Sequence, residues 1–118
     1  MENSWLAGLN AADLAPSEVA SIRLLDQDIV VWRSEDGSLQ AASDRCPHRG
    51  TKLSLGEVRG SQLMCPYHGW MFDGDGNCTY RPAHPAGRVR EGCLRAFATC
   101  ERYGVVWVCL GDPPVEPD

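Results

Sequence analysis

Two short stretches of the chain each place a cysteine close to a histidine. In CPHRGT, one residue separates Cys46 from His48. In CPYHGW, two residues separate Cys65 from His68. Thiolate and imidazole are borderline-soft ligands, which favour zinc, copper and iron–sulfur centres over magnesium or calcium. Because such short spacing lets one tight turn present two ligands, the two stretches predict one metal site held by two loops.

Two kinds of centre use two cysteines and two histidines. A structural zinc site binds all four around one ion, and its usual order pairs Cys with Cys and His with His. In a Rieske [2Fe–2S] centre, two cysteines bind one iron and two histidines bind the other. Each stretch here supplies one residue of each type, which favours the Rieske cluster; structural zinc and four unrelated structural residues stay open as alternatives. The predicted ligands are Cys46, His48, Cys65 and His68.

Composition and charge limit the classes of protein that remain. The chain has 118 residues, which suits a single domain, and a formal net charge of −5. An acidic chain has no broad basic face, which argues against binding to nucleic acid. The longest apolar run, Val105–Leu110, is far shorter than a membrane span, and the first residues lack the features of a signal peptide. We therefore expect a cytoplasmic protein without nucleic-acid or membrane partners.

Short β-favouring runs separated by turn residues indicate an all-β fold. Ser21–Leu25 and Ile29–Arg33 are joined through DQD, and Leu39–Ser43 follows the turn EDGS. Ala96–Glu101 and Val105–Leu110 flank RYG as a further hairpin. The continuous VVWVCL of the last run suggests a strand buried on both faces.

Further short strands surround the second Cys/His stretch. Leu63–Cys65 and Trp70–Asp73 lie on either side of it, and the turn DGDGN leads into Cys78–Arg81. The only helical pattern is NAADLA, which amounts to one turn. Many short strands with frequent Gly and Pro predict an antiparallel β-sandwich or small barrel.

The residues outside the two stretches have simpler interpretations. His84 lies between two prolines and is expected to be a loop residue. No glycine-rich phosphate loop is present, and no carboxylate can be singled out for catalysis, so no catalytic residue is assigned to this chain. The other cysteines are expected to be small buried side chains. They are Cys78, Cys93, Cys100 and Cys109.

The stretch from Cys46 to Trp70, CPHRGTKLSLGEVRGSQLMCPYHGW, resembles the Rieske signature of aromatic-ring-hydroxylating (Rieske non-haem iron) oxygenase large subunits. Arg49 and Gly50 after the first histidine, VR in the middle and CPYHGW at the end carry the resemblance. Weaker similarity extends over most of the chain. The resemblance implies a Rieske fold, in which antiparallel sheets carry an inserted cluster-binding subdomain of two loops.

The expected domain boundaries follow from this resemblance. The Rieske domain is placed at residues 1–112, with the cluster-binding subdomain at about 45–72. Residues 113–118 are acidic and rich in proline, which is typical of a tail or linker.

The chain departs from the Rieske proteins of respiratory complexes at three positions. Thr51 and Tyr67 stand where those proteins carry a disulfide-forming cysteine pair, and Trp70 replaces a serine that donates to a cluster sulfur. Fewer hydrogen bonds to the sulfurs stabilise the reduced cluster less. We expect a midpoint potential near the low end of the Rieske range, which spans about −150 to +300 mV.

The resemblance implies one-electron transfer in a dioxygenase or monooxygenase system. Oxygenases of this family also need a mononuclear iron bound by two histidines and a carboxylate, and only His84 remains after the cluster ligands. Two hypotheses stay open: an N-terminal electron-transfer domain of an oxygenase-type protein, or a stand-alone Rieske-type ferredoxin. In both, an NAD(P)H-dependent reductase or a ferredoxin would donate electrons. The acceptor would be a mononuclear iron oxygenase domain or another terminal enzyme.

Overall fold

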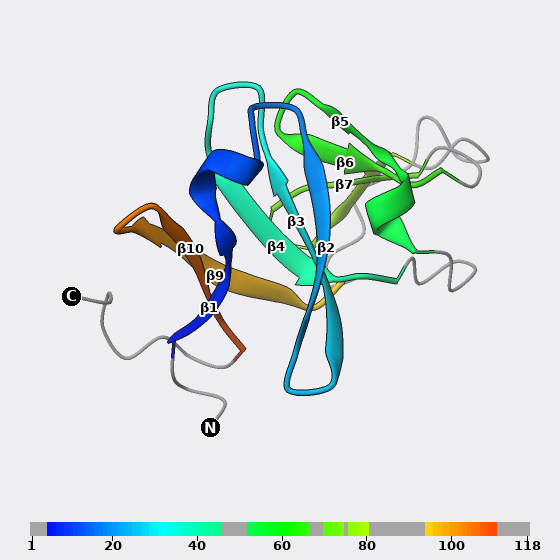
Figure 1. The fold of residues 1–118 in the computed structure, drawn as a ribbon. Helices are drawn as coiled ribbons and strands as arrows, with labels where there is room; N and C mark the ends of the chain where they lie inside the picture. The colour runs from blue at the N-terminus through cyan, green and yellow to red at the C-terminus, as the bar shows by residue number, and fades with distance from the viewer. Residues whose placement is uncertain (1–4, 46–51, 67–69, 75, 81–93, 111–118) are drawn as a thin grey trace.

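In the computed structural model, antiparallel strands form two sheets (Figure 1). The structure describes residues 5–45, 52–66, 70–74, 76–80 and 94–110. The larger sheet has the order β1-β10-β9-β4-β3-β2. Its strands are β1 (Trp5–Asn10), β2 (Val19–Leu24), β3 (Gln27–Arg33), β4 (Leu39–Ser43), β9 (Ala96–Arg102) and β10 (Val105–Cys109). The smaller sheet, in sequence order, contains β5 (Glu57–Arg59), β6 (Gln62–Met64), β7 (Met71–Phe72) and β8 (Cys78–Tyr80).

This arrangement confirms the predicted all-β fold with antiparallel sheets. Two short 3-10 turns, η1 (Ala11–Asp13) and η2 (Leu53–Leu55), interrupt the strands. In the described part of the chain, no helix has both the length and the apolar character needed to cross a membrane.

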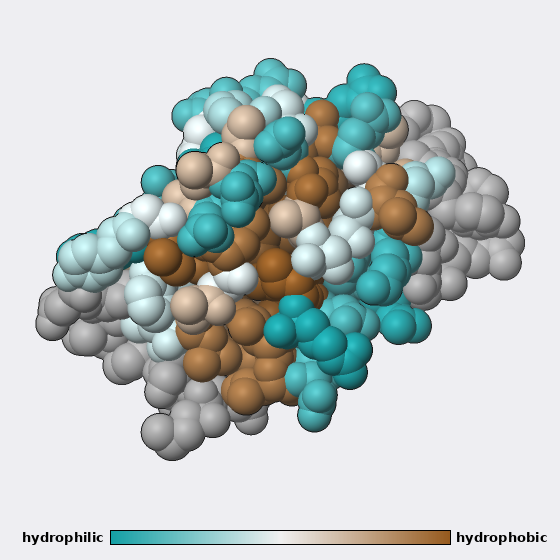
Figure 2. Space-filling model, viewed as in Figure 1, coloured by the Kyte–Doolittle hydropathy of each residue, from teal (hydrophilic) through white to brown (hydrophobic). Residues whose placement is uncertain are grey.

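The larger sheet curls until its two edge strands meet. A Cβ placed on Gly8 of β1 would lie 3.0 Å from Cδ1 of Ile22 in β2, so the edges pack together through side chains. Apolar surface gathers between β1 and β2 in Figure 2. The sheet therefore forms a small, nearly closed barrel. Its buried core consists of Leu14, Ile29, Val31, Ala41, Phe97, Val106, Val108 and Leu110.

Strand β3 is buried on both of its faces. Successive strand residues point to opposite faces, and all four central residues of β3 are fully buried. Ile29 and Val31 face the barrel core, whereas Val30 and Trp32 face a second core under the smaller sheet. The second core contains Val30, Trp32, Ala42, Leu53, Val58, Leu63, Cys65, Phe72, Cys78 and Leu94.

The indole of Trp32 joins the two sheets directly. Its ring is fully buried in the second core, and its Nε1–H donates to the carbonyl of Ser61 at 3.2 Å. Beside it, the amide of Glu35 donates to the carbonyl of Gly60 at 2.8 Å, and the Gly60 amide donates to the Glu35 carboxylate at 2.8 Å. The turn between β5 and β6 is thereby fixed to the end of β3.

The hairpins expected from the sequence are present, with one shift. Strand β4 has the predicted bounds, and β9 pairs with β10 across the turn at Tyr103 and Gly104. The turn between β2 and β3 lies at Leu25 and Asp26, whose φ angles are 48° and 63°, rather than at DQD. Gln27 and Asp28 instead extend β3 and pair with β2.

Two strands and one burial pattern differ from the sequence-based expectation. The sequence did not predict β1, which pairs with β10 from Trp5 opposite Cys109 to Asn10 opposite Val105, or the three-residue β5. The prediction that β10 is buried on both faces is only partly right. Val106, Val108 and Cys109 are buried, but Val105 and Trp107 are half-buried.

The turn η2 lies close against strand β6. A Cβ placed on Gly56, which ends η2, would lie 2.0 Å from the carbonyl oxygen of Met64. Real Cβ atoms do not approach a backbone oxygen so closely, so this contact requires glycine. The side chain of Leu53 in η2 is fully buried in the second core.

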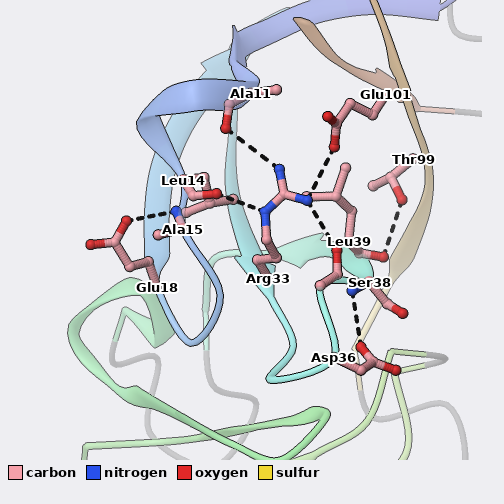
Figure 3. A network of polar contacts seen from close by, with 11 residues as sticks. Ala11, Leu14, Ala15, Glu18, Arg33, Asp36, Ser38, Leu39, Thr99 and Glu101 are labelled. Carbon is pink, nitrogen blue, oxygen red and sulfur yellow. Dashed lines mark hydrogen bonds and ion pairs between the residues drawn. The ribbon is translucent and has the colours of Figure 1, made fainter. Parts of the chain in front are cut away.

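Arg33 connects four segments of the barrel end through its guanidinium (Figure 3). Its Nε donates to the carbonyl of Leu14 at 2.6 Å, and Nη1 donates to the carbonyl of Gly37 at 3.0 Å. Nη1 also forms an ion pair with Glu101 of β9 at 3.0 Å, and Nη2 donates to the Ala11 carbonyl at 3.5 Å. The Arg33 side chain is only 12% exposed. One partly buried cation therefore holds η1 and the residue after it, the β3–β4 turn and β9 together.

Asp36 stabilises the turn between β3 and β4 that the sequence predicted. Its carboxylate accepts a hydrogen bond from the amide of Ser38 at 2.9 Å (Figure 3). Backbone and side-chain hydrogen bonds from Ser38 lower the pKa of Asp36 below its usual value. A lowered folded-state pKa stabilises the fold above the unfolded pKa, and this contribution is lost as the pH falls through the folded pKa.

Arg33→Ala should lower the free energy of unfolding by about 2–4 kcal/mol, because three backbone carbonyls lose a partly buried charged donor. Urea denaturation followed by circular dichroism measures this change. Arg59→Ala is the control, since Arg59 pairs with Glu57 at 3.0 Å but both side chains are 58% exposed. It should cost about 0.5 kcal/mol or less, and equal losses in the two variants would contradict this account of Arg33.

Gly56→Ala should lower the thermal midpoint more than Gly37→Ala does. Gly37 has a φ of +94°, but no atom lies within 4 Å of its Cβ position. Alanine there costs only backbone strain, about 1–2 kcal/mol. Alanine at Gly56 must displace η2 from β6. Differential scanning calorimetry of both variants checks the order, and a smaller loss for Gly56→Ala would show that η2 can move at little cost.

Candidate metal centre

Of the four predicted ligands, one lies within the described residues. Cys65 directly follows β6, whereas Cys46, His48 and His68 lie outside the described part of the chain. The structure does describe the residues on both sides of each Cys/His stretch. These flanking residues show how the fold holds the ends of the two loops.

The second Cys/His stretch joins two paired strands, β6 and β7. Leu63 pairs with Phe72 and Met64 with Met71, and the amide of Cys65 then donates to the carbonyl of Trp70 at 2.7 Å. The hydrogen-bonded ladder thus continues to the last residue before the loop and to the first after it. Cys65 is only 1% exposed, so its thiol lies in a water-poor, apolar environment.

Trp70 is the first described residue after this loop. The half-buried indole contacts the second core. Its ring centroid lies 6.5 Å from that of Phe72, with a tilted geometry. This aromatic pair shields the base of the loop next to Cys65 from water.

The first Cys/His stretch lies between β4 and η2. Asp44, the residue after β4, is 1% exposed. Its Oδ1 accepts from the amide of Ser54 at 2.7 Å, and its Oδ2 accepts from the Ser54 hydroxyl at 2.6 Å. A third bond comes from the hydroxyl of Ser21 in β2, at 3.1 Å from Oδ2. A single carboxylate therefore connects the chain before the first loop to the chain after it.

Sequence analysis did not identify Asp44 or Ser54 as residues of the site. Asp following a strand is usually a solvated turn residue. The one available signal was that Asp44 precedes a proposed ligand by two positions, and this signal does not separate a buried carboxylate from an exposed one.

The two loops begin and end on the same small group of residues. Leu53, from the end of the first loop, and Cys65, from the start of the second, both belong to the second core. Gly56 lies directly against Met64, the residue before Cys65. In Figure 1, η2 is the short green coil beside β5 and β6. Two segments distant in sequence are thus held side by side where the Cys/His stretches emerge.

A shallow pocket opens next to these anchors. It has a volume of about 280 Å³ and is lined by Leu55, Gly56, Glu57, Met64 and Pro66. Leu55 is 71% exposed there. The pocket lies outside the second core and carries a single ionisable side chain, so it does not by itself form a metal site.

The donor set suits a mixed Cys/His cluster. The described residues contain no group of three His, Cys, Asp or Glu side chains that could hold a metal ion, so any such site needs residues outside the described part of the chain. Cys65 is buried at the mouth of the second loop, as a thiolate ligand of a water-excluded cluster requires. The described ends of the two stretches, Leu53 and Cys65, belong to the same buried core.

The other cysteines in the described residues agree with a packing role. Cys78 and Cys109 are buried, and Cys100 is half-buried. The fourth such cysteine, Cys93, lies outside the described residues, as does His84. The prediction that these cysteines are small buried side chains is therefore confirmed for Cys78 and Cys109 and only partly for Cys100.

Comparison with known proteins gives a family and a set of relatives. Residues 4–101 match the family model described as "Rieske [2Fe-2S] domain". The chain is 40% identical over 117 residues to the oxidoreductase NdmD of Pseudomonas putida, covering 98% of this chain and 20% of that protein. It is 39% identical over 115 residues to the 4beta-methylsterol monooxygenase of Methylococcus capsulatus, covering 94% of this chain and 31% of that protein.

Solved structures agree with the sequence matches. NdmA of Pseudomonas putida with caffeine superposes with a TM-score of 0.85 at 35% identity, covering 93% of this chain and 33% of that one. Apo dicamba monooxygenase superposes with a TM-score of 0.87 at 33% identity, covering 98% and 36%. The chain thus spans about a fifth to a third of the length of these relatives.

The family match decides between the two metal centres that the sequence left open. A Rieske-type [2Fe–2S] cluster, rather than structural zinc, is the cofactor of this family, and electron transfer to and from redox partners is its function. The match covers most of the chain, and the fold agrees with that of solved Rieske oxygenases at more than 30% identity. The chain belongs to the Rieske [2Fe–2S] domain family.

Proposed function

We propose that Cys46 and Cys65 bind one iron of the cluster and that His48 and His68 bind the other. The spacing of the two stretches supports this assignment, because each loop then supplies one thiolate and one imidazole. The burial of Cys65 and the shared anchoring of both loops also support it. When bound, the cluster accepts and returns one electron.

The protein around the proposed ligands excludes water and fixes the loop ends. Trp70 and Phe72 pack against each other directly after the second loop, and Leu53 is buried in the same core as Cys65. A low dielectric environment strengthens the electrostatic interactions of any charge placed there. We assign the exclusion of water to these side chains of the second core, none of which takes part in the electron transfer itself.

We further propose that the chain transfers electrons within an oxygenase system. The observation that carries this proposal is the Rieske family match over residues 4–101, together with relatives named as monooxygenases and oxygenase components. A reductase using NAD(P)H, or a ferredoxin, would supply electrons. A mononuclear iron in an oxygenase domain would receive them. The Rieske domain would comprise residues 1–112, with the cluster-binding subdomain at about 45–72 and a linker or tail at 113–118.

A second candidate is a carrier that delivers electrons from a reductase to a separate terminal enzyme. The relative NdmD is named an oxidoreductase and not an oxygenase, so the names of the relatives are compatible with this candidate as well. The two can be separated by reading the gene beyond codon 118. The first candidate requires a following domain with two histidines and a carboxylate for a mononuclear iron, whereas the carrier requires no such domain.

The ligand assignment predicts the result of electron paramagnetic resonance on the dithionite-reduced protein. A mixed Cys/His cluster has a lower average g value than an all-thiolate cluster, because imidazole donates less charge than thiolate to the reduced iron. His48→Ala and His68→Ala should each abolish this spectrum. His84→Ala is the matched control, since it removes the third histidine of the chain, and it should leave the spectrum unchanged. A normal spectrum in either of the first two variants would refute the assignment.

The midpoint potential should lie near the low end of the Rieske range of about −150 to +300 mV, because Trp70 cannot replace a hydroxyl donor to a cluster sulfur. Spectroelectrochemical titration measures it. The potential should also fall with rising pH in the alkaline range, by up to about 59 mV per pH unit for one proton per electron, since reduction makes the ligand imidazoles more basic. A midpoint well above zero, or one constant from acid to strongly alkaline pH, would contradict this prediction.

A further inference from the structure

Asp44 differs from the other acidic residues in the described part of the chain because it is buried. Only Ser34 and Asp44 are buried polar residues there, and the carboxylate of Asp44 is the single acidic group among them. A buried carboxylate is costly unless it is hydrogen-bonded. Both oxygens of Asp44 accept hydrogen bonds, and its own amide donates to the carbonyl of Asp28 at 3.0 Å. Main chain and side chain are therefore both fixed.

The partners of the Asp44 carboxylate differ in where they lie along the chain. Ser21 belongs to β2, on the barrel. Ser54 belongs to η2, on the far side of the first Cys/His stretch. The two bonds to Ser54, at 2.7 and 2.6 Å, thus close a loop of chain whose interior contains Cys46 and His48. The bond to Ser21 closes no such loop.

The Ser54 bonds also reach the second loop. Ser54 lies between Leu53, buried in the second core, and Gly56, which lies against Met64. Met64 directly precedes Cys65. Any displacement of η2 would therefore shift the mouth of the second loop as well as the end of the first. Asp44 is the polar contact that fixes η2 to the barrel.

We propose that Asp44 is a positioning residue that holds the first ligand loop closed and in register with the second, so that the protein retains its [2Fe–2S] cluster. This inference rests on the ligand assignment proposed above. Without the carboxylate, the polar connection between β4 and η2 is lost, and binding the cluster must then offset more loop-closure entropy. The cluster should then leave the protein faster, although the barrel remains folded.

The experiment measures cluster release from the purified holoprotein. The visible absorbance of the cluster is followed after addition of an excess of a ferrous and ferric iron chelator, at a temperature where circular dichroism shows every variant to be folded. Asp44→Ala should release its cluster at least about tenfold faster than the wild type, because it removes three hydrogen bonds. Asp44→Asn should be intermediate, since its amide oxygen can still accept from the Ser54 amide.

Two serine variants form a matched pair. Ser54→Ala and Ser21→Ala each remove one hydroxyl that donates to the same atom, Oδ2 of Asp44. Ser54→Ala should accelerate release about fivefold, the effect of one hydrogen bond, whereas Ser21→Ala should stay within about twofold of the wild type. This pair also tests the proposal if Asp44→Ala does not fold.

Arg33→Ala controls for general destabilisation. Arg33 lies at the opposite end of β3 from Asp28, about 15–20 Å away along the strand. It should lower the thermal midpoint at least as much as Asp44→Ala does while leaving the release rate unchanged. The reduced Asp44→Ala protein should also show a broadened electron paramagnetic resonance spectrum, because its ligand geometry is less uniform.

The outcomes separate this inference from the ligand assignment. If the wild type lacks a Rieske spectrum, the assignment itself fails. If the wild type has the spectrum but Ser54→Ala and Ser21→Ala release the cluster at the same rate, or Arg33→Ala releases it as fast as Asp44→Ala, then Asp44 acts only through general stability and the inference is wrong.

Discussion

The whole structure depends on one strand that is buried on both of its faces. The four central residues of β3 alternate between two cores, with Ile29 and Val31 in the barrel and Val30 and Trp32 under the smaller sheet. Truncating a buried aromatic side chain typically costs about 3–5 kcal/mol, so Trp32 alone contributes much of the attachment between the two sheets. Since the two cores share a strand, the smaller sheet cannot separate from the barrel without exposing the barrel as well.

This shared strand explains how a small protein can fix the two ends of each Cys/His stretch. The smaller sheet has short strands and would be marginal by itself. It gains its rigidity from Trp32, from the turn contacts at Gly60 and from the burial of Leu53. The barrel in turn is closed at its other end by the Arg33 network. Rigid elements placed below loops are the usual way to fix the geometry of a metal centre.

The sequence predicted the local features of the fold better than its long-range contacts. Hairpin turns carry their own chemistry, such as the Gly of EDGS and of RYG, and β4, which follows EDGS, was therefore predicted with its correct bounds. Strand β1 was missed because it forms only by pairing with β10, at the other end of the chain. The Cys/His spacing predicted the cofactor, since ligand chemistry is local.

The burial of Asp44 could not be predicted in this way. Its partners Ser21 and Ser54 lie 23 and 10 residues away, and nothing in the residue types marks them as a group. The same limitation applies to Gly56, which looks like an ordinary turn glycine until β6 is placed beside it. Supporting residues of a site depend on tertiary packing, whereas its ligands depend on chemistry.

The pairing of β1 with β10 has a consequence for how such a module can be joined to other proteins. Trp5 lies opposite Cys109 in these adjacent strands, and in Figure 1 β1 and β10 lie on the side of the molecule away from η2. Segments that enter and leave a domain side by side are the geometry that tolerates insertion into a host sequence and circular permutation. A neighbour joined at either strand would therefore leave η2 and the smaller sheet in place.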